Sequence, residues 1–156
     1  MEAPCHPGRP VRIKENVMKI STRSRYGLRL LMDLASRPGD KPVFLGDIAA
    51  RLAVSEKYLS KLVIPMRRAG LIRSVRGAYG GYALAIQPAS LSLCQIIECL
   101  EGSLSLVDCV EQPDCCERAE DCTARRIWGG LEKVMHDYCM AVSLADLVGQ
   151  ETAIRA

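Results

Sequence analysis

The spacing of apolar residues predicts a chain built mainly from helices. After Ser21 and Thr22, which can cap a helix, apolar side chains recur at every third or fourth position, as on one face of an α-helix. The same period returns over residues 45–53, 56–68, 93–100 and 123–142. The stretch 71–86 differs, because its apolar residues flank a glycine-rich segment, as in a β-hairpin. The pattern predicts a mainly α fold with one small hairpin.

Two of these helices follow each other closely enough to form a helix-turn-helix. Residues 45–53 end in a short turn, and Ser55 is placed to cap the next helix. Pro65 lacks an amide proton, so we expect that second helix to bend or loosen there. Its outer face carries basic and hydroxyl groups, which suit DNA phosphates and base edges. The predicted DNA contacts on this face are Lys57, Tyr58, Ser60 and Lys61.

The hairpin that follows predicts the wing of a winged helix. Glycines at 77, 80 and 81 allow a tight turn beside the exposed tip. A wing tip lies along the DNA backbone, and its arginine can enter the minor groove. We therefore expect Arg76 and Tyr79 in the wing, and Arg23 and Arg25 near the start of the first helix, to contact DNA.

The distribution of charge supports a polyanionic partner for one half of the chain. Residues 18–85 hold 13 Lys and Arg against 4 Asp and Glu, a net charge of +9. Residues 86–156 hold 5 against 12, a net charge of −7. A basic half beside an acidic half indicates that the first part binds double-stranded DNA and the second part does not.

The helix predicted over 123–142 carries an apolar stripe that its own chain has little surface to cover. A second copy of the chain is the expected cover, which gives a twofold homodimer. Such a dimer places two winged domains on the two halves of an inverted repeat in the DNA operator. The stripe consists of Ile127, Leu131, Val134, Tyr138 and Val142, with Trp128 and Met135 beside it.

Four cysteines fall in a short acidic segment just before that helix. Cys109, Cys115, Cys116 and Cys122 lie among Glu, Asp and Pro residues, which indicates a polar loop. Clustered thiolates on a loop are soft ligands for iron–sulfur clusters, zinc or Cu(I). By contrast, Cys94 and Cys99 lie among Ile and Leu on a predicted helix, where cysteine usually acts as a small buried apolar residue.

The composition and the chain ends exclude several classes of protein. The first residues contain no apolar signal segment, and no apolar run approaches the roughly 20 residues of a membrane span, so we expect a cytoplasmic protein. No nucleotide-binding glycine loop or histidine-bearing catalytic pair indicates an enzyme. His6 falls in a proline-rich start, and His136 is expected on an exposed helix face. Translation starting at Met18 would make residues 1–17 a non-native extension; otherwise we expect them to be disordered.

From Met18 to about Val148 the chain resembles the bacterial winged-helix repressors that include IscR, NsrR, RirA and CymR. The resemblance rests on residues 18–29, on the helix 55–62, on the wing 69–82 and on the loop cysteines. It implies a transcriptional repressor whose operator affinity is switched by an iron–sulfur cluster, with cluster-assembly or sulfur and iron genes as targets. The ligands that it implies are Cys109, Cys116 and Cys122, with Cys115 as the alternative to Cys116.

The fourth ligand and the cluster type stay open, because two expected positions depart from the family pattern. Arg125 stands where some members have a histidine ligand, and Arg25 where others have an aspartate. A two-iron or a four-iron cluster, bound zinc, a nitric-oxide or iron signal, and a metal-free repressor therefore remain alternatives. The other candidates for the fourth ligand are a small external molecule, Cys115, Glu111, Asp114, Glu117 and Asp121.

These patterns divide the chain into consecutive parts with different expected roles. Ser143 is expected to cap a last short helix over 144–148. The expected parts are the extension 1–17, the winged helix-turn-helix 18–86, a linking helix within 87–107, the cysteine loop 108–122, the dimerisation helix 123–142 and the C-terminal helix and tail 143–156.

Overall fold

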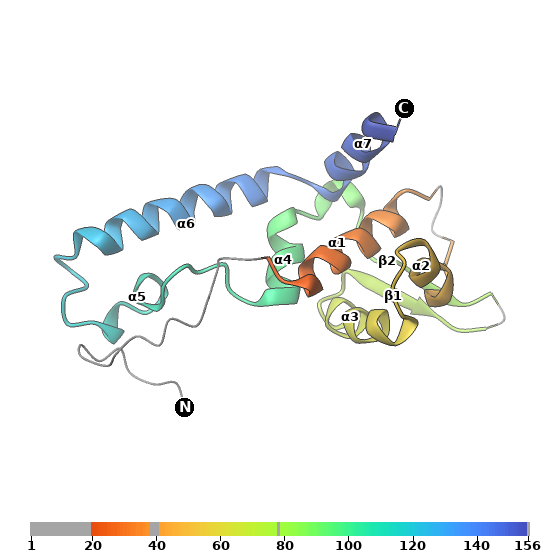
Figure 1. The fold of residues 1–156 in the computed structure, drawn as a ribbon, viewed down its shortest axis with the longest axis horizontal. Helices are drawn as coiled ribbons and strands as arrows, with labels where there is room; N and C mark the ends of the chain where they lie inside the picture. Colours follow the sequence, from red (N-terminus) through yellow and green to blue (C-terminus); the bar gives the residue numbers. More distant parts are fainter. Residues whose placement is uncertain (1–19, 38–40, 78, 156) are drawn as a thin grey trace.

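The chain forms a winged domain from which one long helix projects, as a computed structural model shows (Figure 1). The structure describes residues 20–37, 41–77 and 79–155. The expectations for residues 1–17, including a start at Met18 and the place of His6, therefore lie outside the described residues. The mainly helical architecture with one two-stranded hairpin agrees with the predicted fold class.

The winged domain begins with three helices, of which the first and the third are capped as expected. These are α1 (Thr22–Ala35), α2 (Leu45–Arg51) and α3 (Glu56–Arg68). The Ser21 hydroxyl accepts hydrogen bonds from the amides of Arg23 and Ser24, at 3.1 and 3.4 Å. The Ser55 hydroxyl accepts one from the Tyr58 amide at 3.2 Å. Helix α3 continues through Pro65, so the lost hydrogen bond does not end it.

A segment that precedes α2 in the chain pairs with the hairpin as a third piece of extended backbone. Strands β1 (Ile72–Val75) and β2 (Gly81–Leu84) pair antiparallel, with Ile72 opposite Leu84. Val43 forms a single bridge to Tyr82, in which each amide donates to the other residue's carbonyl at 2.9 Å. A Cβ at Gly81 would lie 2.3 Å from the Val43 carbonyl oxygen, and its φ is +145°. Glycine is thus required where the wing meets the segment before α2.

The core lies where α1, α3 and the hairpin meet a fourth helix, α4 (Leu93–Glu101). A Cβ at Gly27 of α1 would lie 2.4 Å from a Leu100 methyl and 2.8 Å from the Met66 methyl. The missing side chain lets α1 pack directly on both α3 and α4. Asp33 of α1 holds α2 in place, because the Arg51 guanidinium donates to both carboxylate oxygens at 2.7 and 2.6 Å. The fully buried core side chains include Leu30, Leu31, Ile48, Leu59, Ile72, Leu91 and Ile96.

After α4 the chain leaves the winged domain through the segment that precedes the long helix, and it returns along that helix. A short 3-10 turn η1 (Pro88–Ser90) precedes α4, which Ser92 and Gln95 cap reciprocally. Helix α5 (Asp108–Glu111), the 3-10 turn η2 (Pro113–Cys115) and the rest of the cysteine loop lie by the end of α6 (Thr123–Ala141) that is far from the winged domain (Figure 1). Glu132 of α6 holds the outgoing segment, since its carboxylate accepts from the Ser105 hydroxyl and the Leu106 amide at 3.1 and 3.2 Å.

The last helix, α7 (Leu144–Arg155), is longer than the short helix expected over 144–148. It begins as expected, because Ser143 and Asp146 exchange hydrogen bonds at 2.9 and 3.2 Å. The Ser143 hydroxyl, at 2.6 Å, and then the Ser143 amide donate to the Asp146 carboxylate and hold its pKa below its usual range. The helix continues because it packs against α1 and η1, with Leu144 fully buried, so tertiary contact extends what local sequence starts.

Replacing Gly81 with Ala is expected to destabilise the winged domain. The new Cβ would meet the Val43 carbonyl, and the backbone conformation is one that alanine rarely adopts. We expect the free energy of unfolding to fall by about 1–3 kcal/mol in urea titrations followed by circular dichroism at one protein concentration. Gly149→Ala is the matched control, since no atom lies within 4 Å of its added Cβ. Equal stability of the Gly81→Ala and wild-type chains would contradict this account.

Candidate DNA-binding face and cysteine loop

The outer face of α3 presents most of the DNA contacts predicted for it. Lys57, Ser60 and Lys61 are exposed there. The Ser60 hydroxyl donates to the Glu56 carbonyl at 2.9 Å, which leaves its oxygen as a possible acceptor facing solvent. Arg67 and Arg68, near the end of the same helix, are exposed as well and extend the positive surface. This face can therefore bind phosphates along a groove of DNA.

Tyr58 is placed differently from its neighbours on α3. Its ring packs edge-on against Tyr26 of α1, with ring centroids 5.8 Å apart and planes at 86°. Its hydroxyl is buried and has no hydrogen-bond partner among the described residues. Arg29 lies over the other ring of the pair, 5.3 Å from its centroid. Tyr58 therefore contributes to the packing of α3 on α1, unlike its exposed neighbours on the same helix.

The remaining predicted DNA contacts lie at the start of α1 and in the wing. Arg23 and Arg25 are exposed, and Arg25 donates to the Thr22 hydroxyl at 3.3 Å. Arg76 is exposed, and the Tyr79 ring is 89% exposed, the largest value among the exposed large apolar side chains of the described residues. A ring this exposed packs little against the described residues and is accessible to an external contact.

The cysteine loop carries its thiols on three short pieces of backbone that lead into α6. Cys109 lies in α5, Cys116 follows η2, and Cys122 is the residue that caps α6. These three cysteines and Cys115 are each partly exposed. The Cys122 sulfur accepts from the Arg125 amide at 3.5 Å. A helix N-terminus favours negative charge, so this position suits a thiolate ligand.

Arg125 holds the loop together, a role that the sequence analysis missed. Its guanidinium donates to the Cys109 carbonyl at 2.7 Å and to the Ala119 carbonyl at 3.1 Å. One side chain thus joins the first part of the loop, its last turn and the start of α6. In the sequence Arg125 stood out only as a replacement for a histidine ligand. An arginine in the first turn after a long polar loop was the available signal, since loop carbonyls lack regular partners.

Three further cysteines lie in the packed part of the chain. Cys94 is 1% exposed, which confirms its expected burial, and burial together with the Glu98 carboxylate raises the pKa of its thiol to about 11. Burial also raises the pKa of Cys99 and Cys139. Among the described residues, the group of three donor atoms that lie within 4.8 Å of one another is Cys94, Glu98 and His136 rather than a set of loop thiols.

Comparison with known proteins assigns the chain to a family. The model of the Rrf2 family, described as iron-dependent transcriptional regulators, matches residues 20–150. The chain belongs to the Rrf2 family. Protein rrf2 of Nitratidesulfovibrio vulgaris is 42% identical over 131 residues, which are 84% of this chain and 87% of that protein. The Rrf2 match supports transcription regulation and DNA binding, and the relatives are regulators rather than enzymes.

Solved structures of two Rrf2 regulators share the fold. CymR, the global cysteine regulator of B. subtilis, superposes with a TM-score of 0.72 at 38% identity and covers 86% of this chain and 98% of its own. IscR of T. potens superposes with a TM-score of 0.70 at 34% identity and covers 88% and 90%. These neighbours confirm the winged-helix fold. The individual metal ligands, DNA contacts and domain limits stay predictions.

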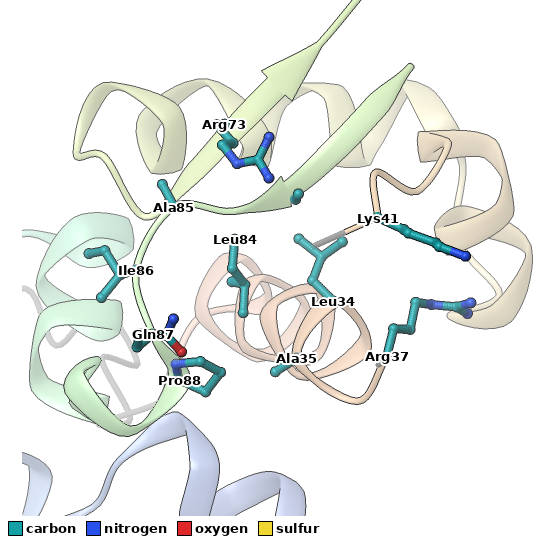
Figure 2. A pocket seen from close by; sticks show the side chains of 11 residues that line it. Leu34, Ala35, Arg37, Lys41, Arg73, Leu84, Ala85, Ile86, Gln87 and Pro88 are labelled. Atoms are coloured by element: carbon teal, nitrogen blue, oxygen red, sulfur yellow. The ribbon is translucent and has the colours of Figure 1, made fainter. Parts of the chain in front are cut away.

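A hollow of about 530 Å³ lies between the end of α1 and the hairpin of this Rrf2 protein (Figure 2). Leu34, Leu84 and Pro88 contribute apolar atoms to it, and Arg37 and Arg73 add basic groups. No predicted DNA contact or loop cysteine lines it, so it belongs to neither candidate site. No helix in the described part of the chain is both long and apolar enough to span a membrane.

Replacing Arg125 with Ala is expected to loosen the cysteine loop. The loop would lose both guanidinium bonds, to Cys109 and Ala119. We expect amide hydrogen exchange over 108–122 in the metal-free protein to become about 5–30-fold faster, equivalent to about 1–2 kcal/mol of local stability. Arg118→Ala, which removes an exposed arginine of the same loop, should leave the exchange rates unchanged. Identical rates in the Arg125→Ala and wild-type proteins would rule out this role.

Proposed function

We propose that this Rrf2 protein is a transcriptional repressor whose affinity for its DNA operator is switched by an iron–sulfur cluster on the cysteine loop. The observation that carries the proposal is that partly exposed cysteines lie along the loop leading into α6, the last of them, Cys122, capping that helix. The proposed ligands are Cys109, Cys116 and Cys122, with Cys115 as the alternative to Cys116. Soft thiol donors on an acidic loop, beside a helix end that favours anions, fit such a cluster.

The apolar stripe on α6 supports a homodimer. In the single chain Val134 and Tyr138 are 65% and 67% exposed, and Ile127, Trp128 and Leu131 are exposed too. An apolar surface of this length is costly in water, and a second copy offers the same stripe. We infer that two α6 helices pack side by side and join two winged domains. Two domains in one particle match an operator that is an inverted repeat.

An antiparallel pairing of α6 explains how the loop can act on DNA binding. The loop lies at the end of α6 that is far from its own winged domain (Figure 1). In an antiparallel pair, that end lies beside the other end of the second helix, where the second winged domain is attached. A change in the loop therefore acts at the base of the other domain. Because both α3 helices must enter the major groove in register, a small shift changes affinity.

Each protein group has a defined task in this proposal. A bound cluster would supply a rigid crosslink between the thiols that is lost on oxidation or exchange. Arg125 keeps the loop backbone near α6 in both states, through its bonds to two carbonyls. The exposed Lys57, Ser60 and Lys61, with Arg23, Arg25, Arg76 and Tyr79, bind DNA. A coupling of about 1–3 kcal/mol between cluster and operator, or about 5–150-fold in affinity, is enough for a switch.

The test is the colour and the DNA affinity of protein purified without oxygen. We expect broad visible absorbance, with iron and acid-labile sulfide in each chain. We also expect a change of about 5–150-fold in affinity for duplexes selected from a random library when the cluster is removed. Replacing Cys109, Cys116 and Cys122 by Ala should abolish the absorbance and give the affinity of the cluster-free protein.

The controls separate the cluster from other outcomes. Cys99→Ala should keep the absorbance, because this thiol is partly buried on α4 and away from the loop. A triple variant that stays coloured would show that the ligand assignment is wrong. Colourless protein with one zinc per chain would favour a zinc-dependent repressor. Colourless protein that takes up no metal even on cluster reconstitution would leave a repressor with another signal.

Replacing Val134 with Asp is expected to separate the dimer. Twofold symmetry would place two carboxylates in the apolar interface, so dimer formation would have to bury two unpaired negative charges. We expect the dimer dissociation constant to rise by about 100-fold or more, measured by sedimentation velocity. Lys133→Ala is the matched control, because Lys133 pairs with Asp137 on an exposed face where an ion pair contributes little. Unchanged association of Val134→Asp would refute this interface.

A further inference from the structure

The junction between α4 and α6 holds a group of potential metal ligands that the proposed function does not use. The Cys94 sulfur, a Glu98 carboxylate oxygen and a His136 ring nitrogen all lie within 4.8 Å of one another. Cys94 and Glu98 are four residues apart on α4, so both side chains project from the same face. His136 comes from α6, more than thirty residues later in the chain. Two helices thus bring three different donors to one point.

We propose that Cys94, Glu98 and His136 bind a divalent transition-metal ion of the zinc class. A thiolate, an imidazole and a carboxylate are the three donor types that zinc takes from proteins. Binding releases the proton of the Cys94 thiol to solvent, and the resulting thiolate and the Glu98 carboxylate together balance the two positive charges of the ion. Water fills the fourth position of the tetrahedron. This site is separate from the cysteine loop, which lies by the far end of α6 (Figure 1).

The geometry needs only small side-chain movements to close on a metal. Bonds of about 2.0–2.3 Å to zinc place tetrahedral ligands about 3.3–3.8 Å apart, against separations of up to 4.8 Å here. Cys94 is 1% exposed and therefore fixed by its surroundings. Glu98 and His136 are exposed, so their side chains are free to turn towards the sulfur. A buried soft ligand beneath two exposed ligands also leaves a path for the ion to enter.

A metal at this place would fix the direction of α6 relative to the winged domain. The two helices are already joined beside the site by the backbone, where the Leu93 amide donates to the Val142 carbonyl at 2.8 Å. A metal bonded to both helices adds a second tie about two turns away along α6. Because the metal binds the folded junction and not separated helices, it also stabilises the fold.

Cobalt binding tests the site in a chain without Cys5 and without the thiols of the cysteine loop. The full-length background has Cys5, Cys109, Cys115, Cys116 and Cys122 replaced by Ser. We expect one Co²⁺ per chain, with a thiolate-to-cobalt charge-transfer band in the near ultraviolet and the visible bands of tetrahedral cobalt. One equivalent of Zn²⁺ should remove both bands and raise the melting temperature of the same chain.

Variants of the three ligands decide the assignment. In the background chain, Cys94→Ala, Glu98→Gln and His136→Gln should each weaken cobalt binding by about tenfold or more, and Cys94→Ala should abolish the charge-transfer band. His136→Gln and Glu98→Gln change exposed side chains, so they test the site without risk to the core. Cys99→Ser is the matched control on α4 and should bind cobalt as the background does.

Three results would overturn the proposal. These are a background chain that shows no cobalt band, a band that persists in Cys94→Ala, and a band that Cys99→Ser removes as completely as Cys94→Ala. Each result is independent of the iron–sulfur proposal, because the loop cysteines are absent from every chain in the test.

Discussion

The direction in which α6 leaves the winged domain is fixed by two backbone hydrogen bonds. The Leu93 amide donates to the Val142 carbonyl, and the Leu144 amide donates to the Leu91 carbonyl, both at 2.8 Å. They join the start of α4 to the end of α6 and the start of α7. Leu91 and Leu144 are fully buried beneath them. Because these bonds lie over apolar side chains, breaking them would leave backbone amide and carbonyl groups without hydrogen-bond partners.

This junction determines where the functional parts lie relative to one another. A rigid helix carries its far end to a distance set by its length and its exit angle. The cysteine loop therefore lies away from the winged domain of its own chain (Figure 1). The apolar stripe on α6 lies between the two and is left without cover. The proposed dimer, the action of the loop on a second winged domain and the ligand group at Cys94 all depend on this junction between α4 and α6.

Local features of the fold were predictable because they depend on neighbouring residues. The caps at Ser21 and Ser55 need only a hydroxyl followed by a helical period. The wing follows from alternating apolar residues around glycines. The end of α7 was not predictable in this way, since its continuation to Arg155 depends on packing against α1 and η1.

The side-chain roles at the two sites were predictable only in part. The exposed lysines of α3 followed from helical spacing and charge. Tyr58 did not, because its ring is held by Tyr26, a residue of another helix. Similarly, Arg125 bonds to carbonyls at Cys109 and Ala119 that only the fold brings near it. Sequence spacing gives the face of a helix, but it does not give the neighbour that this face meets.

The amino-acid pattern was enough to infer the winged helix-turn-helix, the basic first half, the thiol-rich loop and the apolar helix that follows. Periodicity, charge and turn residues are properties of short segments, so they can be inferred without coordinates. Only the tertiary structure decided that Cys94, Glu98 and His136 meet, and that the loop lies far from its own winged domain. Both depend on the angle between α4 and α6, and that angle is set by the hydrogen bonds and packing at their junction.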